Sequence, residues 1–197
     1  TYAHRLPTPS RPLLGLTILV VEDSRYASEA MRLICLRSGA RIRRADCLKS
    51  ARRHLQVYRP SVIVVDLGLP DGSGLDLIRD MAAAVPRVGI ILATSGDDNT
   101  EAGTMEAGAD GFLAKPVTSL AAFQAEVLSR LPEERRPLGP RIVSDDPIHP
   151  DEMALQDDLA HVADVLNDGG EDMLDYVAQF IGGVARSAKD SVLAQAA

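Results

Sequence analysis

The sequence predicts an α/β fold in which a doubly wound sheet of five parallel strands is followed by a small α-helical segment. Three short runs, at residues 16–21, 62–66 and 89–94, consist almost entirely of β-branched or aliphatic residues. Such runs are typical of parallel strands that are covered on both faces. Helical patterns separate the runs, which favours right-handed β-α-β crossovers within an open sheet.

The alternation gives the elements in order. Five strands are expected at Leu16–Val21, Ala40–Ala45, Val62–Asp66, Gly89–Thr94 and Gly111–Ala114. The second strand alternates and is basic, so it is expected at an edge of the sheet. Helices are expected at 24–38, 47–58, 74–84, 98–107 and 118–130, and Gly39 supplies a stop signal for the first of them.

The remaining segments flank this unit of residues 16–131. Residues 1–15 contain three prolines and predict an N-terminal arm without regular structure. Residues 132–150 contain five prolines, which excludes a single helix and predicts a semi-extended linker. Residues 151–197 predict a helical hairpin broken at Gly169-Gly170, with Phe180 and Ile181 buried.

Two amphipathic helices cannot cover both of their apolar faces alone. The hairpin is therefore expected to pack on the α/β unit, on a second copy or on a missing C-terminal portion. We expect a fragment of a longer protein, since the sequence does not begin with Met and its last residues still look helical.

Composition excludes several classes of protein. The chain has 197 residues, of which 46% are hydrophobic, and its two cysteines lie 12 positions apart, so neither a disulfide framework nor a zinc knuckle is indicated. The longest apolar run, at 16–21, is too short for a membrane span. These features predict a cytoplasmic protein without a membrane partner.

The charge is unevenly distributed. Residues 151–197 carry 2 basic and 10 acidic side chains, a net charge of −8; since the whole chain has −7, residues 1–150 have +1. The acidic segment cannot read nucleic acid, because phosphate contacts need Lys and Arg. Residues 37–53 are basic but lack interleaved aromatic residues, so nucleic-acid binding is not expected there either.

Polar residues follow four of the expected strands. In an open parallel sheet, ligands bind beyond the carboxyl ends of the strands, so these residues converge at one edge. Each alone is more often a helix cap or a solvated loop residue, and Asp23 in particular could cap the helix that follows it. The set consists of Glu22, Asp23, Asp66, Thr94, Ser95 and Lys115.

This set predicts phosphoryl chemistry. Clustered carboxylates repel one another unless a cation joins them. Oxygen ligands with an open face suit Mg²⁺, which also takes phosphate oxygens. An aspartate beside Mg²⁺ and a lysine can attack a phosphoryl group and form an aspartyl phosphate, while the two cations neutralise the transferring oxygens.

Residues 16–131 resemble the receiver domain of bacterial two-component response regulators, which has a flavodoxin-like fold. The resemblance rests on four segments in order: LTILVVEDS (16–24), VIVVDLGLPDGSGLDLI (62–78), GIILATSG (89–96) and EAGADGFLAKP (106–116). It implies a regulator that accepts a phosphoryl group from a histidine kinase or a histidine phosphotransfer protein. Such a receiver is a Mg²⁺-dependent switch rather than an enzyme, with only weak autophosphorylation and autodephosphorylation.

The resemblance also implies a role for each matching residue. Asp66 matches the phosphoacceptor, and Lys115 matches the phosphate-pairing lysine, whose bond to Pro116 is cis in the family. Glu22 and Asp23 match the acidic pair that holds the metal. Further matches are Gly68 to the position that lends a backbone carbonyl to the metal, Thr94 to the switch hydroxyl, with Ser95 as its alternative, and Phe112 to the aromatic switch position. The family often has an apolar residue where Gly68 stands.

Two other function classes remain as alternatives. An aspartyl-phosphate hydrolase of the haloacid dehalogenase type would need a second aspartate two residues after Asp66, where Gly68 stands. A phosphorylation-independent interaction module would not need the intact set of Asp23, Asp66 and Lys115.

The C-terminal segment leaves further alternatives. Residues 171–197 faintly resemble the helix that precedes the phosphorylated helix of histidine phosphotransfer domains, here truncated at Ala197; the other interpretation is a generic amphipathic helix. His161 lacks the H-x-x-K-G pattern of such domains. Residues 97–130 and 151–197 are the candidate surfaces for a homodimer.

Overall fold

The computed structural model describes residues 6–144, 146, 148–168 and 170–188. Its central sheet has five parallel strands in the order β2-β1-β3-β6-β7. The strands are β1 (Thr17–Val21), β2 (Arg41–Ala45), β3 (Val62–Asp66), β6 (Ile90–Ser95) and β7 (Gly111–Ala114). The doubly wound α/β fold is therefore confirmed, with the basic strand β2 at an edge as expected.

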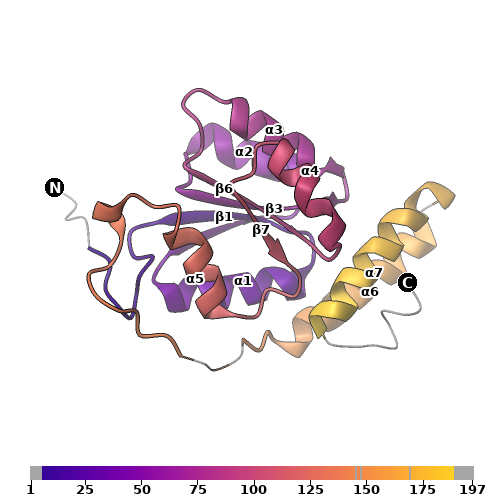
Figure 1. The fold of residues 1–197 in the computed structure, drawn as a ribbon. Coiled ribbons are helices and arrows are strands. Elements are labelled where there is room, and N and C mark those ends of the chain that lie inside the picture. Colours follow the sequence, from indigo (N-terminus) through magenta and orange to yellow (C-terminus); the bar gives the residue numbers. More distant parts are fainter. Residues whose placement is uncertain (1–5, 145, 147, 169, 189–197) are drawn as a thin grey trace.

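Helices cover both faces of the sheet (Figure 1). The helices around it are α1 (Arg25–Ser38), α2 (Leu48–Val57), α3 (Gly74–Ala83), α4 (Glu101–Glu106) and α5 (Leu120–Leu128). Helices α1 and α5 lie on one face and α2, α3 and α4 on the other. The expected helix at 98–107 is interrupted, since Asp98–Thr100 forms a 3-10 turn, and the one at 118–130 is shorter at both ends.

Local signals explain the helix ends. The Ser24 hydroxyl accepts a hydrogen bond from the Ala27 amide and so caps the first turn of α1. Gly39 ends α1 with a φ of 86°, a left-handed conformation that glycine adopts without strain. One feature that the sequence did not indicate is the short hairpin of β4 (Gly68–Leu69) and β5 (Gly72–Ser73), which links β3 to α3.

The two proline-rich segments contribute to the core. Leu13 is fully buried and Ile148 nearly so, and both join the cluster between the sheet and the α1–α5 face. The amide of Ile142 donates to the carbonyl of Pro9, so the segments also contact each other. Within residues 132–150, Glu133–Arg135 forms a 3-10 turn.

The C-terminal segment contains α6 (Glu152–Asp168) and α7 (Leu174–Ala188), joined through a 3-10 turn at Glu171–Met173. The two helices pack on each other through a small cluster that includes Val162, Val177, Phe180 and Val184. Phe180 is buried as expected, whereas Ile181 is half-buried. Gly169, at the expected break, lies outside the described residues.

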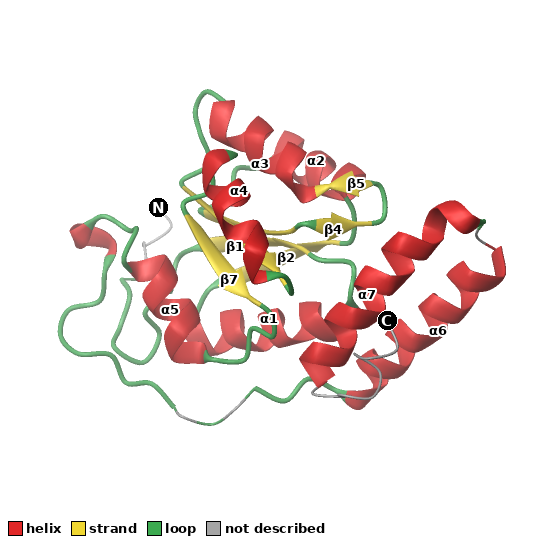
Figure 2. Ribbon diagram, turned by 45° about the vertical axis from the view of Figure 1, so that its right-hand side comes forward, coloured by secondary structure: helices red, strands yellow, loops and turns green. Residues whose placement is uncertain are grey.

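Both C-terminal helices lie beside the edge of the sheet formed by the carboxyl ends of its strands (Figure 2). Among the described helices, none is both long and apolar enough to cross a bilayer.

Candidate functional site

The acidic side chains meet at the carboxyl end of the sheet. Asp66 is the last residue of β3, and Glu22 and Asp23 directly follow the neighbouring strand β1. Each of the three offers a carboxylate oxygen that lies within 4.8 Å of the other two. This convergence follows from the parallel topology, which brings the ends of adjacent strands to one edge.

Lys115 supplies the positive charge of the cluster from the end of β7. Its Nζ lies 2.6 Å from Glu22 Oε2 and 3.2 Å from Asp66 Oδ1, and the lysine side chain is only 9% exposed. The Lys115 amide donates to the Ser95 carbonyl, which ties this residue to β6. The Lys115–Pro116 peptide bond is cis, as the resemblance implied.

Burial and mutual repulsion disfavour the ionised carboxylates. Burial first, and then the charge of Glu22, raise the pKa of Asp66 to about 7, although Lys115 opposes the shift. Burial likewise raises the pKa of Glu22 to about 6 and that of Asp23 to about 6. For Lys115, burial lowers the pKa, but Glu22 and Asp66 outweigh it and hold the ammonium charged.

A divalent cation fits this donor set. With all four side chains ionised, three carboxylates against one ammonium leave a net charge of −2. Hard oxygen donors are the ligands that Mg²⁺ prefers, and it commonly keeps an open position for a phosphate oxygen. The backbone of Gly68 lies beside the Asp66 carboxylate, where it acts to lower the pKa of that group.

The two candidate hydroxyls differ in direction. Thr94 is buried, and its hydroxyl donates to the Leu113 carbonyl at 2.9 Å. Ser95 lines the cavity over Asp66, and its hydroxyl accepts from the Asp97 amide. Phe112 is half-buried against the core on the α2–α4 face of the sheet. The structure thus brings Glu22, Asp23, Asp66 and Lys115 into direct contact or close approach. Thr94 lies on the neighbouring strand β6, and Phe112 lies on β7.

Two residues at the site were missed from the sequence. Tyr176 of α7 donates its hydroxyl proton to Asp23 Oδ2 at 2.6 Å. Asp158 of α6 is 2% exposed and accepts hydrogen bonds at the first turn of α1. No local pattern marks these contacts, because the partners are separated by more than 130 positions.

Comparison with known proteins decides the family. The response regulator receiver domain matches residues 18–126, which is more than half of the chain and includes every strand of the central sheet except the first residue of β1. The chain belongs to the response regulator receiver family. The matched residues contain all the sequence-predicted site positions, and they end before α6 and α7.

Curated relatives of this receiver include two regulators. The KDP operon transcriptional regulatory protein KdpE of Escherichia coli K12 is 34% identical over 101 residues, covering 50% of this chain and 44% of that protein. The virulence transcriptional regulatory protein PhoP of Shigella flexneri is 33% identical over 104 residues, covering 51% and 46%. The receiver therefore spans less than half the length of the curated relatives that it matches.

Solved structures confirm the flavodoxin-like receiver fold. A putative response regulator from Chloroflexus aurantiacus has a TM-score of 0.54 at 26% identity, covering 58% of this chain and 98% of that one. The receiver domain of the sensor histidine kinase PA1611 from Pseudomonas aeruginosa has a TM-score of 0.52 at 24% identity, covering 58% and 95%. That second structure holds a magnesium ion coordinated in its active-site cleft.

Proposed function

We propose that this receiver accepts a phosphoryl group on Asp66 from a phosphorylated histidine of a kinase or phosphotransfer protein, as a cytoplasmic step of two-component signalling. The observation that carries the proposal is the contact of Asp66 with Lys115 at 3.2 Å, beside the carboxylates of Glu22 and Asp23. In this proposal the receiver is residues 16–131, with an N-terminal arm (1–15), a linker (132–150) and a C-terminal helical segment (151–197).

The transfer is a displacement at phosphorus. An Asp66 carboxylate oxygen attacks the phosphorus atom, the new P–O bond forms, and the P–N bond to the donor imidazole breaks with its electron pair leaving on nitrogen. Lys115, which is held charged, pairs with the phosphoryl oxygens. Deprotonated Asp66 is the nucleophile, so its raised pKa makes a bound cation important for reaction at neutral pH.

Magnesium would be held by Asp23, Asp66 and the backbone carbonyl of Gly68, with Glu22 nearby, and when bound it would neutralise charge on the carboxylates and on the phosphoryl oxygens. The carboxylate oxygens within 4.8 Å of one another support this assignment.

Thr94 would couple the site to the rest of the domain. Its hydroxyl now donates to the Leu113 carbonyl, and a phosphoryl oxygen on Asp66 offers a stronger, charged acceptor. Exchange of one partner for the other gives two states with different contacts, which is what a population shift requires. Phe112, on the neighbouring strand β7, would follow this movement and alter the surface of residues 97–130.

Labelling tests the assignment directly. The wild type and Asp66→Asn are incubated with Mg²⁺ and a small phosphodonor, and acid-labile phosphate on the protein is measured. Asp76→Asn is the matched control, because Asp76 is an exposed aspartate of α3 that pairs with the exposed Arg79. Labelling should be lost in Asp66→Asn and retained in Asp76→Asn; equal labelling of all three proteins would refute Asp66 as the acceptor.

A further inference from the structure

The C-terminal helices lie directly over the phosphoacceptor site. Figures 1 and 2 show α6 and α7 beside the end of the sheet where β1 and β3 terminate. Helix α6 runs against α1, and α7 contacts both α1 and the short strand β4 that follows Asp66. The family match ends at residue 126, so α6 and α7 lie outside the matched receiver.

Tyr176 engages a carboxylate of the site. Its hydroxyl donates to Asp23 Oδ2 at 2.6 Å, a short hydrogen bond of the charge-assisted kind. A carboxylate oxygen that accepts a hydrogen bond from a phenol hydroxyl has a lone pair engaged, so it is a poorer ligand for a cation. Tyr176 and Mg²⁺ therefore compete for Asp23.

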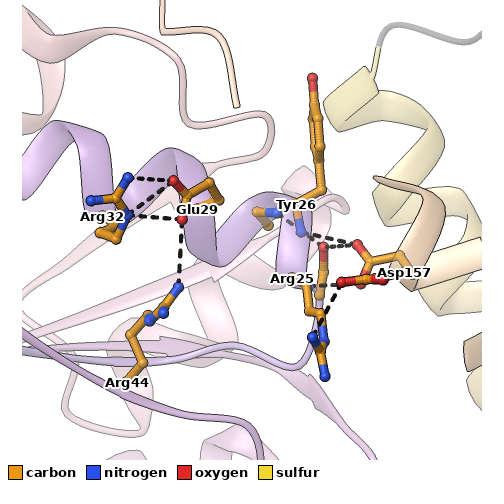
Figure 3. A network of polar contacts seen from close by, with 9 residues as sticks. Arg25, Tyr26, Glu29, Arg32, Arg44 and Asp157 are labelled. Atoms are coloured by element: carbon orange, nitrogen blue, oxygen red, sulfur yellow. Dashed lines mark hydrogen bonds and ion pairs between the residues drawn. The ribbon is translucent and has the colours of Figure 1, made fainter. Parts of the chain in front are cut away.

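Asp158 anchors the hairpin on the other side. Its two carboxylate oxygens accept from the amide of Arg25 at 2.7 Å, the amide of Tyr26 at 3.1 Å and the hydroxyl of Ser24 at 2.8 Å. These donors form the beginning of α1, where the helix dipole favours a negative charge. Figure 3 shows the neighbouring Asp157 facing Arg25, an ion pair whose side chains are 73% and 49% exposed.

Two glycines allow α7 to approach closely. A Cβ atom at Gly68 would lie 2.8 Å from the amide carbon of the Gln179 side chain, and one at Gly96 would meet the Arg186 guanidinium. Between these contacts, a cavity of about 60 Å³ remains over Asp66, closed on one side by α7. That volume holds a few water molecules, and it is far too small for the side chain and backbone of a protein donor.

We propose that the α6–α7 hairpin is a cis-acting cover of the phosphoacceptor site, which must release Asp23 and move off α1 before Mg²⁺ and a phosphodonor gain full access to Asp66. The inference rests on the proposed function of Asp66. It assigns Tyr176 as the competitor of the cation and Asp158 as the residue that anchors the hairpin to the start of α1. In such a receiver the hairpin is in equilibrium between a closed and an open position, and Asp66 stays unphosphorylated while the closed position dominates. Binding of Mg²⁺ and the phosphodonor at the site, or binding of a partner protein to the hairpin, shifts this equilibrium toward the open position.

The first test measures Mg²⁺ alone on the full chain. Isothermal titration calorimetry compares the wild type with Tyr176→Phe. Tyr58→Phe is the matched control, since the Tyr58 hydroxyl hydrogen-bonds His54 at the end of α2 and does not line the cavity over Asp66. Loss of a hydrogen bond to a charged group predicts at least about threefold tighter Mg²⁺ binding in Tyr176→Phe and no change in the control. Weaker or equal binding in Tyr176→Phe would overturn the proposal, since Tyr176 would then orient Asp23 or be neutral.

The second test measures access to Asp66. The rate of labelling by acetyl phosphate, at a Mg²⁺ concentration well below saturation, is compared for the wild type, Asp158→Ala and the control Asp157→Ala, which removes an equal charge and an exposed ion pair. Asp158→Ala should label about tenfold faster, because several charge-assisted hydrogen bonds of the closed state are lost. If circular dichroism shows that Asp158→Ala has lost helix, the milder variant Asp158→Asn replaces it. Its labelling rate is expected to lie between those of the wild type and the tenfold increase.

Hydrogen exchange distinguishes a failure of the hairpin proposal from a failure of the proposal that Asp66 is the phosphoacceptor. Saturating Mg²⁺ should speed amide exchange in α6 and α7 of the wild type, whether or not Asp66 is the acceptor. Faster exchange together with no labelling of any variant would sink the acceptor assignment and leave the cover intact. Unchanged exchange, with equal labelling rates in the wild type and Asp158→Ala, would sink the cover and leave Asp66 as the acceptor.

Discussion

Removal of the Asp66 charge is expected to stabilise the metal-free protein at neutral to alkaline pH. Asp66 is 7% exposed, and burial first, then Glu22, raise its pKa from 3.8 to about 7. Because the native pKa lies above the unfolded value, the native state binds more protons between about pH 4 and 7. The free energy of unfolding therefore falls as the pH rises through this window, and Asp66→Asn escapes that loss.

The magnitude follows from the pKa. At about 1.4 kcal/mol per pKa unit, a rise from 3.8 to about 7 sets an upper limit of about 4 kcal/mol for the gain at pH 8. Asparagine also removes one of the two carboxylate partners of the buried Lys115. This loss opposes the gain, so we expect a net stabilisation of about 1–2 kcal/mol.

Urea unfolding at pH 8 and pH 5, with a chelator present, measures this difference. The advantage of Asp66→Asn over the wild type should be about 2–3 kcal/mol smaller at pH 5 than at pH 8, because about two of the three pKa units that separate the native and unfolded states lie between these pH values. Asp76→Asn, which loses an exposed ion pair, should change stability by less than about 1 kcal/mol at either pH. A variant Asp66→Asn that is less stable than the wild type at pH 8, or equally stabilised at both values, would refute the argument.

Three further predictions concern the switch, the hairpin and the proline-rich arm. Thr94→Ala should still be labelled on Asp66. In the wild type, beryllofluoride should change the amide chemical shifts of residues 97–130, and in Thr94→Ala it should not; a full response of the variant would exclude Thr94 as the switch hydroxyl. Phe180→Asp should loosen the α6–α7 cluster and speed amide exchange there while labelling persists; unchanged exchange would show that the cluster does not depend on this ring. Leu13→Ala should cost about 2–5 kcal/mol in urea unfolding, whereas a loss under about 1 kcal/mol would mean that the arm adds little to the core.

The central sheet and the acidic site were predictable because their signals are local. Runs such as Val62–Asp66 are apolar throughout since both faces of the strand are covered, and all five expected strands are present within one or two residues. Parallel topology then carries the residues at the strand ends to one edge without any further information. The convergence of Asp23, Asp66 and Lys115 was therefore predictable from their places at the ends of the expected strands.

Other features depend on contacts between distant segments, for which the sequence holds no period. Leu13 and Ile148 lie in segments whose prolines exclude regular elements, yet each fills a gap in the core beside α1 and α5. The apolar stripe of α7 predicted that this face is buried, but it did not indicate which surface covers it: the α/β unit, a second copy or a missing C-terminal portion. The structure places α6 and α7 on the α/β unit, through polar contacts of Asp158 and Tyr176 that a hydrophobic pattern cannot indicate.

Gly68 shows how a local sequence signal and a contact between distant segments are related. Against the receiver pattern, a glycine two residues after the acceptor is a departure, because an apolar side chain is frequent there. In the folded chain a Cβ at this position would lie 2.8 Å from the Gln179 side chain, and Gly96, beyond the neighbouring strand, lies beneath Arg186 in the same way. Two positions without side chains thus lie beneath the helix that covers the acidic cluster. The ends of Gln179 and Arg186 are flexible, so a methyl group could be accommodated, whereas a large apolar side chain at Gly68 would have to displace α7. The packing of α7 against Gly68 therefore explains the departure from the pattern. The loop that would supply the backbone carbonyl to the metal is also the surface against which α7 packs.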